Sequence, residues 1–276
     1  MSFFVERMGN FMMELDTQRF VSTLSMVELP KDLDEAIAQA QTATKAAIED
    51  GYRRLLVELV FPELKAQPIT EKFLPVFTEL GMALKVFFPD TGAAALARRD
   101  WGEVPFKIAD LGSRNLAVET LLEPDDECFL IVEPSPVEVS KVEQLCQHAG
   151  DRPVVMLLPR LEDVSIVGIG LAARQLRERF LSTLESCYYI QPLQDASVFR
   201  CYPSPWQVLL ETEEDTYEVV SQTATKPVGE ALERILMGAS EESATGEENP
   251  DTSSGLPRKG KGFLSELKRF LKALNQ

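Results

Sequence analysis

Histidine is nearly absent from this chain of 276 residues, and cysteine is scarce. His148 is the only histidine, and Cys128, Cys146, Cys187 and Cys201 stand far apart with no paired spacing. A histidine-based catalytic triad would have to use that one residue, and a metal site would have few nitrogen and sulfur ligands. We therefore expect no metal and no cofactor. The cysteines are typical of small apolar side chains in a reducing compartment.

Two motifs that mark common enzymes are also missing. The chain has no G-x-S-x-G, the nucleophile turn of hydrolases, and no G-x-x-x-x-G-K-[ST] phosphate loop. Residues 168–173 match the dinucleotide pattern G-x-G-x-x-A, but a poor strand precedes them and they come late in the chain. We interpret them as a flexible connection into a helix. The sequence thus assigns no catalytic residue, and we expect a protein that is not an enzyme.

Long hydrophobic runs are lacking. The longest uncharged and mainly apolar stretch, Val164 to Ala173, is too short to span a bilayer. The N-terminus mixes acids and bases from Glu6 onward, which is unlike a secretory signal. We expect a cytoplasmic protein that does not cross a membrane.

Positive charge is scarce everywhere except at the C-terminal end. The formal net charge is −16. Residues 258–276 hold six Lys or Arg and one acid, a net +5, which leaves −21 for the preceding residues. Such an acidic surface repels phosphates, so we expect no nucleic-acid partner. A change of sign confined to one end is typical of an interaction tail.

Strand-like and helix-like segments alternate along most of the chain. Apolar runs predict strands at 55–61, 84–88, 106–111, 128–132 and 154–158, and helical spacing predicts helices at 32–51, 69–80, 92–99, 137–148 and 171–186. Short strands at 187–192, 197–202 and 206–212 predict an antiparallel meander before a last helix at 227–237. The predicted fold class is α/β, a mostly parallel sheet with helices on both faces and the meander at one edge.

The composition divides the chain into four parts. Residues 1–28 form an N-terminal extension with the apolar spacing of a helix, and residues 29–238 form the α/β domain. Residues 239–257 are acidic and nearly free of apolar side chains, so they cannot offset the entropy of ordering and are predicted to be a disordered linker. Residues 258–276 are predicted to form a basic amphipathic helix.

Polar residues gather where the predicted strands end. The carboxyl ends of parallel strands meet at one edge of a sheet, and ligands bind in the crevice there. The candidate ligand-binding residues at this edge are Glu63, Asp90, Thr91, Gly92, Asp110, Arg114, Glu133 and Arg160. The two arginines would contact an anion, and Thr91-Gly92 would open a helix N-terminus. The alternative is that these charges and the neighbouring Pro62, Pro89, Pro134 and Pro159 simply end strands, as in many such folds.

The basic tail carries the most regular pattern. Its apolar face consists of Phe263, Leu264, Leu267, Phe270, Leu271 and Leu274, and its polar side holds Lys268, Arg269 and Lys272. Three uses remain open. Such a helix can lie on an anionic membrane surface, dock into a groove of a partner protein, or fold back on its own acidic domain.

Four segments carry a resemblance to a known family: Leu29 to Ala36, Arg53 to Leu59, Phe88 to Gly92 and Leu96 to Trp101. They resemble a domain-of-unknown-function family of cyanobacteria and plastids that includes the chloroplast low-photosystem-II-accumulation type proteins. The resemblance would cover about residues 29–237. It implies a role at the thylakoid membrane in photosystem II assembly and supplies no active site.

These observations lead to one functional expectation and two alternatives. We expect a non-enzymatic accessory protein that associates peripherally with the photosynthetic membrane through its C-terminal helix. The first alternative is an enzyme or small-ligand-binding module that uses the crevice at the strand ends. The second is an adaptor whose C-terminal helix docks in a partner-protein groove.

Overall fold

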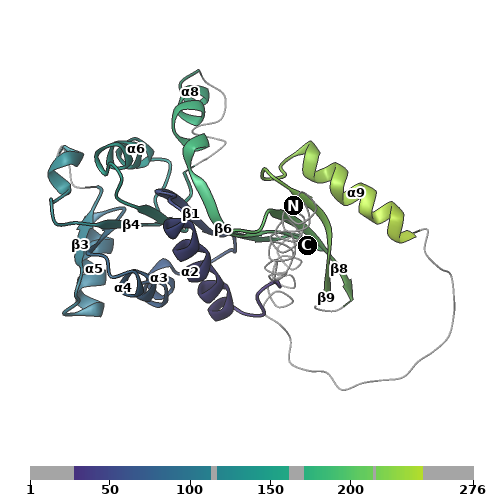
Figure 1. Cartoon of the computed structure of the whole chain (residues 1–276), viewed down its shortest axis with the longest axis horizontal. Helices are drawn as coiled ribbons and strands as arrows, with labels where there is room; N and C mark the ends of the chain where they lie inside the picture. Colours follow the sequence, from purple (N-terminus) through teal and green to yellow (C-terminus); the bar gives the residue numbers. More distant parts are fainter. Residues whose placement is uncertain (1–27, 113–116, 162–170, 214–215, 245–276) are drawn as a thin grey trace, which may run out of the picture.

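The computed structural model describes residues 28–112, 117–161, 171–213 and 216–244. Within these ranges the strands form one nine-stranded sheet in the order β3-β2-β4-β5-β1-β6-β7-β8-β9 (Figure 1). The strands from β3 to β6 in this order pair in parallel, and β7, β8 and β9 continue the sheet with antiparallel pairing. The predicted α/β class, with an antiparallel meander at one edge of a mostly parallel sheet, is confirmed.

The elements have the following bounds. The strands are β1 (Arg54–Leu59), β2 (Leu84–Phe88), β3 (Lys107–Asp110), β4 (Cys128–Val132), β5 (Val154–Leu157), β6 (Glu185–Pro192), β7 (Ala196–Cys201), β8 (Trp206–Glu213) and β9 (Thr216–Thr223). The helices are α2 (Leu33–Glu49), α3 (Ala66–Phe73), α4 (Pro75–Glu79), α5 (Thr91–Trp101), α6 (Val139–His148), α8 (Leu171–Arg179) and α9 (Glu230–Ala244), with 3-10 turns η1 (Val118–Leu121) and η2 (Leu181–Thr183).

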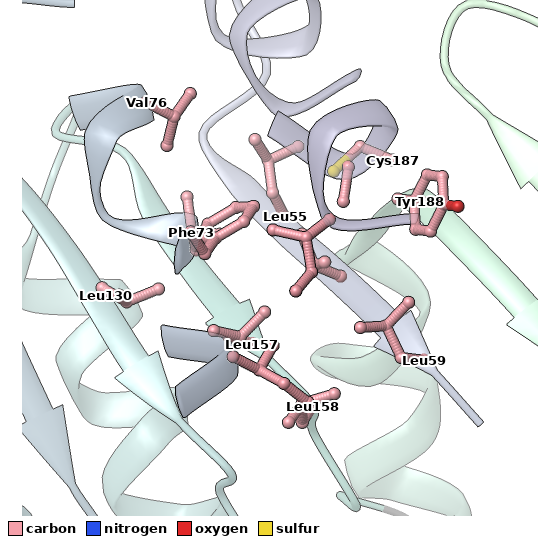
Figure 2. Packing of buried hydrophobic residues seen from close by; sticks show 14 of the residues in the cluster. Leu55, Leu59, Phe73, Val76, Leu130, Leu157, Leu158, Cys187 and Tyr188 are labelled. Carbon is pink, nitrogen blue, oxygen red and sulfur yellow. The ribbon is translucent and has the colours of Figure 1, made fainter. Parts of the chain in front are cut away.

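Helices cover both faces of the parallel strands, because each strand buries alternate residues on opposite sides. In β4, Cys128 and Leu130 pack with helices α2 to α5, whereas Phe129 and Ile131 pack with α6 and α8. Figure 1 shows these two groups of helices on opposite sides of the sheet. Figure 2 shows part of the first cluster, in which Phe73 of α3 lies near Leu55 of β1.

Helix α2 lies close to the sheet because its buried face is built from small residues. Ala36, Ala40, Ala43 and Ala47 are at most 1% exposed, so the helix backbone can approach β1 and β6. The Asp32 carboxylate caps the helix by accepting a hydrogen bond from the Glu35 N–H at 2.8 Å.

Several predicted helix bounds are corrected. The helix expected at 69–80 is two helices, because Pro75 begins a new one at its first position. The helix expected at 171–186 ends at Arg179, because Glu185 and Ser186 already pair with β1. Helix α9 begins at Glu230 rather than 227 and runs to Ala244. Residues 239–244 therefore continue a helix where the linker was expected to begin.

The meander is longer than predicted. Strand β9 was not expected, since its residues are exposed or half-buried and it pairs with β8 at the edge of the sheet. The four cysteines are free and buried, which agrees with their predicted role as small apolar side chains. The N-terminal extension before residue 28, most of the linker and the basic amphipathic helix lie outside the described residues. Among the described residues, no helix is both long and apolar enough to span a bilayer.

Candidate functional site

The order in which the chain adds strands to the sheet reverses between two neighbouring parallel strands, β2 and β4. From β2 it continues through α5 to β3 at one edge, whereas from β4 it continues through α6 to β5 in the opposite direction. Ligands of open α/β sheets bind at such a reversal, outside the carboxyl ends of the strands. Asp90 follows β2 and Glu133 follows β4, so these two predicted residues flank the reversal.

The loop after β2 is tightly packed. The Asp90 carboxylate caps α5 by accepting a hydrogen bond from the Ala93 N–H at 2.9 Å, and Thr91 and Gly92 open the helix as predicted. Gly112, which follows β3, packs closely against this loop. A Cβ on Gly112 would lie 2.6 Å from the carbonyl oxygen of Pro89, so this position has no space for a side chain. Asp90 therefore has a structural role in addition to its place at the edge.

Glu133 and Arg160 are in direct contact. The Arg160 Nη2 lies 3.2 Å from the Glu133 Oε1, and the Arg160 N–H donates to the carbonyl oxygen of Pro134 at 2.8 Å. Arg160 remains 68% exposed, so it can also reach a ligand. Glu63 follows β1, and Asp110 ends β3 at the far edge of the sheet. Arg114 lies outside the described residues.

A cleft that the sequence did not reveal adjoins this edge, and it shares Arg160 with it. Its volume is about 640 Å³, and it opens over β1 and β6 on the α8 side of the sheet. One wall comes from η2, and the other comes from the segment that leads into α9. The polar and aromatic lining residues are Glu58, Arg160, Ser182, Glu185, Ser186, Arg200, Trp206, Thr225 and Lys226.

Glu58 lies in the cleft because successive side chains of β1 point to opposite faces of the sheet. Leu55, Val57 and Leu59 are buried against α2, which turns Leu56 and Glu58 to the other face. The Glu58 side chain is only 16% exposed. Its Oε2 accepts a hydrogen bond from the Ser186 hydroxyl at 2.5 Å, and its Oε1 lies 3.5 Å from the Lys226 Nζ. The carboxylate is thus fixed by one hydroxyl and one ammonium group.

Lys226 also lies against two aromatic rings. Its Nζ is 3.8 Å from the centroid of the Tyr189 ring and 5.6 Å from that of Trp206. The two aromatic residues are 3% and 4% exposed, and their ring centroids are 5.1 Å apart. Burial raises the pKa of the Tyr189 phenol, and the nearby Glu58 carboxylate raises this pKa further. The phenol therefore stays neutral beside the ammonium group.

Arg200 also lies over Trp206, the second of these two aromatic residues. Its Nη2 pairs with the Glu185 carboxylate, and its guanidinium lies 5.3 Å from the Trp206 ring centroid. Its Nε is buried and, within the described part of the chain, has no hydrogen-bond partner. The cleft thus combines three cations with two carboxylates and an aromatic surface. This set can hold a polar ligand by ion pairs and cation–π contacts.

A second charged cluster lies near the opposite ends of the strands. The Lys107 ammonium donates to carboxylates of Glu123, Asp125 and Asp126 at 2.8–2.9 Å, and Lys85 also donates to Glu123. These hydrogen bonds lower the pKa of Glu123 and of Asp125. The three carboxylates are close enough to hold a metal ion, but the ammonium groups of the two lysines already bind them and offset two of their three charges. We assign this cluster a structural role.

Residues 30–234 match the family model described as Domain of unknown function (DUF1995). The match covers well over half of the chain and includes all nine strands and every residue that lines the cleft. It confirms the resemblance to a domain-of-unknown-function family. The chain therefore belongs to the DUF1995 family.

Proposed function

We propose that this protein is a non-enzymatic accessory protein that attaches peripherally to the photosynthetic membrane through residues 258–276 and assists photosystem assembly. The observation that carries the proposal is the division of charge, with +5 in the tail and −21 in the rest of the chain. The photosynthetic setting and the assembly role rest on the family resemblance.

The charge division also predicts how the protein is oriented on the membrane. Basic side chains near an anionic lipid surface each contribute about 1 kcal/mol, and buried apolar side chains of an interfacial helix add to this. Lys268, Arg269 and Lys272 would supply the first contribution, and the face that includes Leu267 and Phe270 would supply the second. The same lipid charge repels the acidic part of the chain. The α/β domain would then face away from the membrane with its cleft accessible.

The test is flotation of the purified protein on liposomes of anionic, thylakoid-like lipid, with and without residues 258–276. We expect tail-dependent binding that weakens as salt is added, because salt screens the electrostatic part. Leu267→Asp with Phe270→Asp should abolish binding. Ser265→Asp with Gln276→Asp adds the same charge on the polar side of the predicted helix and should reduce binding less. Equal binding of the two double variants, or no flotation of the full chain, would contradict the proposal.

The alternative in which the tail docks on a partner protein gives a different result. An adaptor would not float on lipid, and a tail peptide used as bait would retain a specific protein that the Leu267→Asp, Phe270→Asp peptide does not. We keep the membrane proposal because clustered basic residues beside bulky apolar residues suit an anionic lipid surface without a specific groove.

A second candidate function is the binding of a small polar ligand by the α/β domain. The cleft supports it, because Arg160 links the predicted strand-end residues to Glu58, Arg200 and Lys226. Arg160→Ala should leave stability within about 0.5 kcal/mol, since the side chain is exposed. A ligand-dependent melting shift that this variant loses would support the candidate, and a shift that the variant keeps would remove Arg160 from the site.

A further inference from the structure

We propose that Glu58, Tyr189 and Trp206 form a recognition site for the ammonium group of a small ligand, a site that Lys226 occupies in this structure. The Lys226 Nζ lies 3.8 Å and 5.6 Å from the two ring centroids and 3.5 Å from the Glu58 Oε1. Aromatic faces combined with a carboxylate are what proteins use to bind organic ammonium ions. The inference does not depend on membrane attachment.

The three groups that surround the ammonium are held by the sheet. Tyr189 and Trp206 form a small buried cluster with Val198 on strands β6 to β8. Glu58 is fixed on β1 by the hydrogen bond from Ser186. The site is therefore largely pre-formed, which limits the cost of ordering it when a ligand binds.

The cation itself comes from outside the sheet. Lys226 belongs to the segment between β9 and α9, and its side chain is 36% exposed. Its distance to the Glu58 carboxylate is at the long limit of a hydrogen bond. A ligand ammonium could replace it at these three groups while the lysine turns to solvent.

The rest of the cleft indicates what else the ligand carries. The same cavity is lined by Arg160 and Arg200, which pair with Glu133 and Glu185, and Ser182 and Thr225 add hydroxyl groups. An ammonium together with an anionic group that reaches the exposed Arg160 would match this distribution. The ligand class is therefore a small zwitterion, an alkylamine that also bears a carboxylate or a similar anion.

The experiment uses Lys226→Met in the full chain, which removes the ammonium and leaves the three surrounding groups. The variant should melt lower than the unchanged protein, and n-butylammonium chloride should restore about 2–4 °C relative to equal sodium chloride. 6-Aminohexanoate, a zwitterionic probe, should act at least tenfold lower in concentration. The unchanged protein should need more of either probe, because Lys226 competes for the site.

Lys45→Met is the matched control. Lys45 pairs with Glu79 at 3.6 Å and is 40% exposed, close to the values for Lys226, but among the described residues it lies over no aromatic ring. Amines should not stabilise this control beyond sodium chloride. Adding Glu58→Gln to Lys226→Met should abolish the amine effect.

A second measurement covers the case in which Lys226→Met does not fold. Trp101 and Trp206 are the only tryptophans, so Trp101→Phe leaves Trp206 as the reporter in a chain that keeps Lys226. Saturable fluorescence change with 6-aminohexanoate, but not with hexanoate, would support the proposal. No saturable change in this chain, or no amine-specific shift in folded Lys226→Met, would overturn it.

Discussion

At the residue scale, Asp90 illustrates how a side chain at the strand ends can hold the fold together while it stands in a candidate site. Its carboxylate accepts the Ala93 N–H at the start of α5, as Asp32 does for Glu35 at the start of α2. These backbone donors would otherwise lack a partner in the helix. Changing Asp90 therefore alters stability as well as any ligand contact, and the two effects have to be separated.

Two substitutions at this position separate them. Asp90→Ala should lower the free energy of unfolding by about 1 kcal/mol, because alanine cannot cap the helix. Asp90→Asn should cost less, because asparagine caps about as well as aspartate while it removes the charge. Urea denaturation at pH 7 measures both. Equal stability of Asp90→Ala and the unchanged protein would mean that the cap contributes little, and Asp90→Asn is the variant to use in ligand assays.

Gly112 is a second residue whose role is set by a close approach. A Cβ there would lie 2.6 Å from the Pro89 carbonyl oxygen and 3.2 Å from the Asp90 Cα, both of them backbone atoms. Gly112→Ala should therefore destabilise the protein by about 1–3 kcal/mol. Gly238→Ala is the control, because this exposed position in α9 has nothing within 4 Å of the added carbon. It should be neutral or stabilising by up to about 1 kcal/mol in the same titration. A neutral Gly112→Ala would show that the two loops can separate at little cost.

At the element scale, a charged contact between Arg179 and Glu143 joins α8 to α6. The Arg179 Nε and Nη2 donate to the two Glu143 carboxylate oxygens at 2.7 and 2.9 Å. These hydrogen bonds lower the pKa of Glu143 below its ordinary value. The pair therefore stabilises the fold at pH values above the ordinary glutamate pKa. This contribution is lost as the pH falls through the lowered pKa of Glu143.

Glu143→Gln tests this contact. At pH 7 we expect a loss of about 1 kcal/mol, a modest value because the Arg179 side chain is 55% exposed to solvent. The difference between variant and unchanged protein should shrink as the pH is lowered from about 5 to about 3. Glu178→Gln, on the exposed side of α8, is the control and should show no such pH dependence. A difference that stays constant with pH would mean that packing, not charge, explains the loss.

The elements also show what a single sequence can predict. Strands β2 and β4 have the predicted bounds, because five consecutive buried residues in each produce a compact run that is apolar except for Lys85 in β2. Strand β9 escaped prediction because it lies at the edge of the sheet and leaves its residues partly exposed. The cleft was not predicted from the sequence for another reason. Glu58 meets Ser186 and Lys226 across 128 and 168 residues of sequence, and nothing in the local pattern specifies such distant pairs.

At the scale of the whole molecule, two hydrophobic clusters share one sheet. Val86 and Leu130 belong to the cluster under α2 to α5, while Phe87 and Phe129 belong to the cluster under α6 and α8. Neither cluster can lose its packing without disrupting strands that support the other. We therefore expect the described part of the chain to unfold in one cooperative transition.

The same clusters predict which part of the chain folds by itself. Their buried residues run from Leu29 to Leu209, and the half-buried Tyr217 and Val219 pack against them. The half-buried Leu232 packs against the small cluster of Tyr189, Val198 and Trp206. A chain of residues 28–244 should therefore melt within about 2 °C of the full protein, with coincident transitions by circular dichroism and tryptophan fluorescence. A fall of the melting temperature by more than about 4 °C would correspond to a loss of at least about 1 kcal/mol in the free energy of unfolding. It would mean that residues 1–27 or 245–276 pack on the domain, and a chain of residues 28–276 would tell which. Recovery in that chain would favour a tail that folds back on its own acidic domain over one that is available to a membrane.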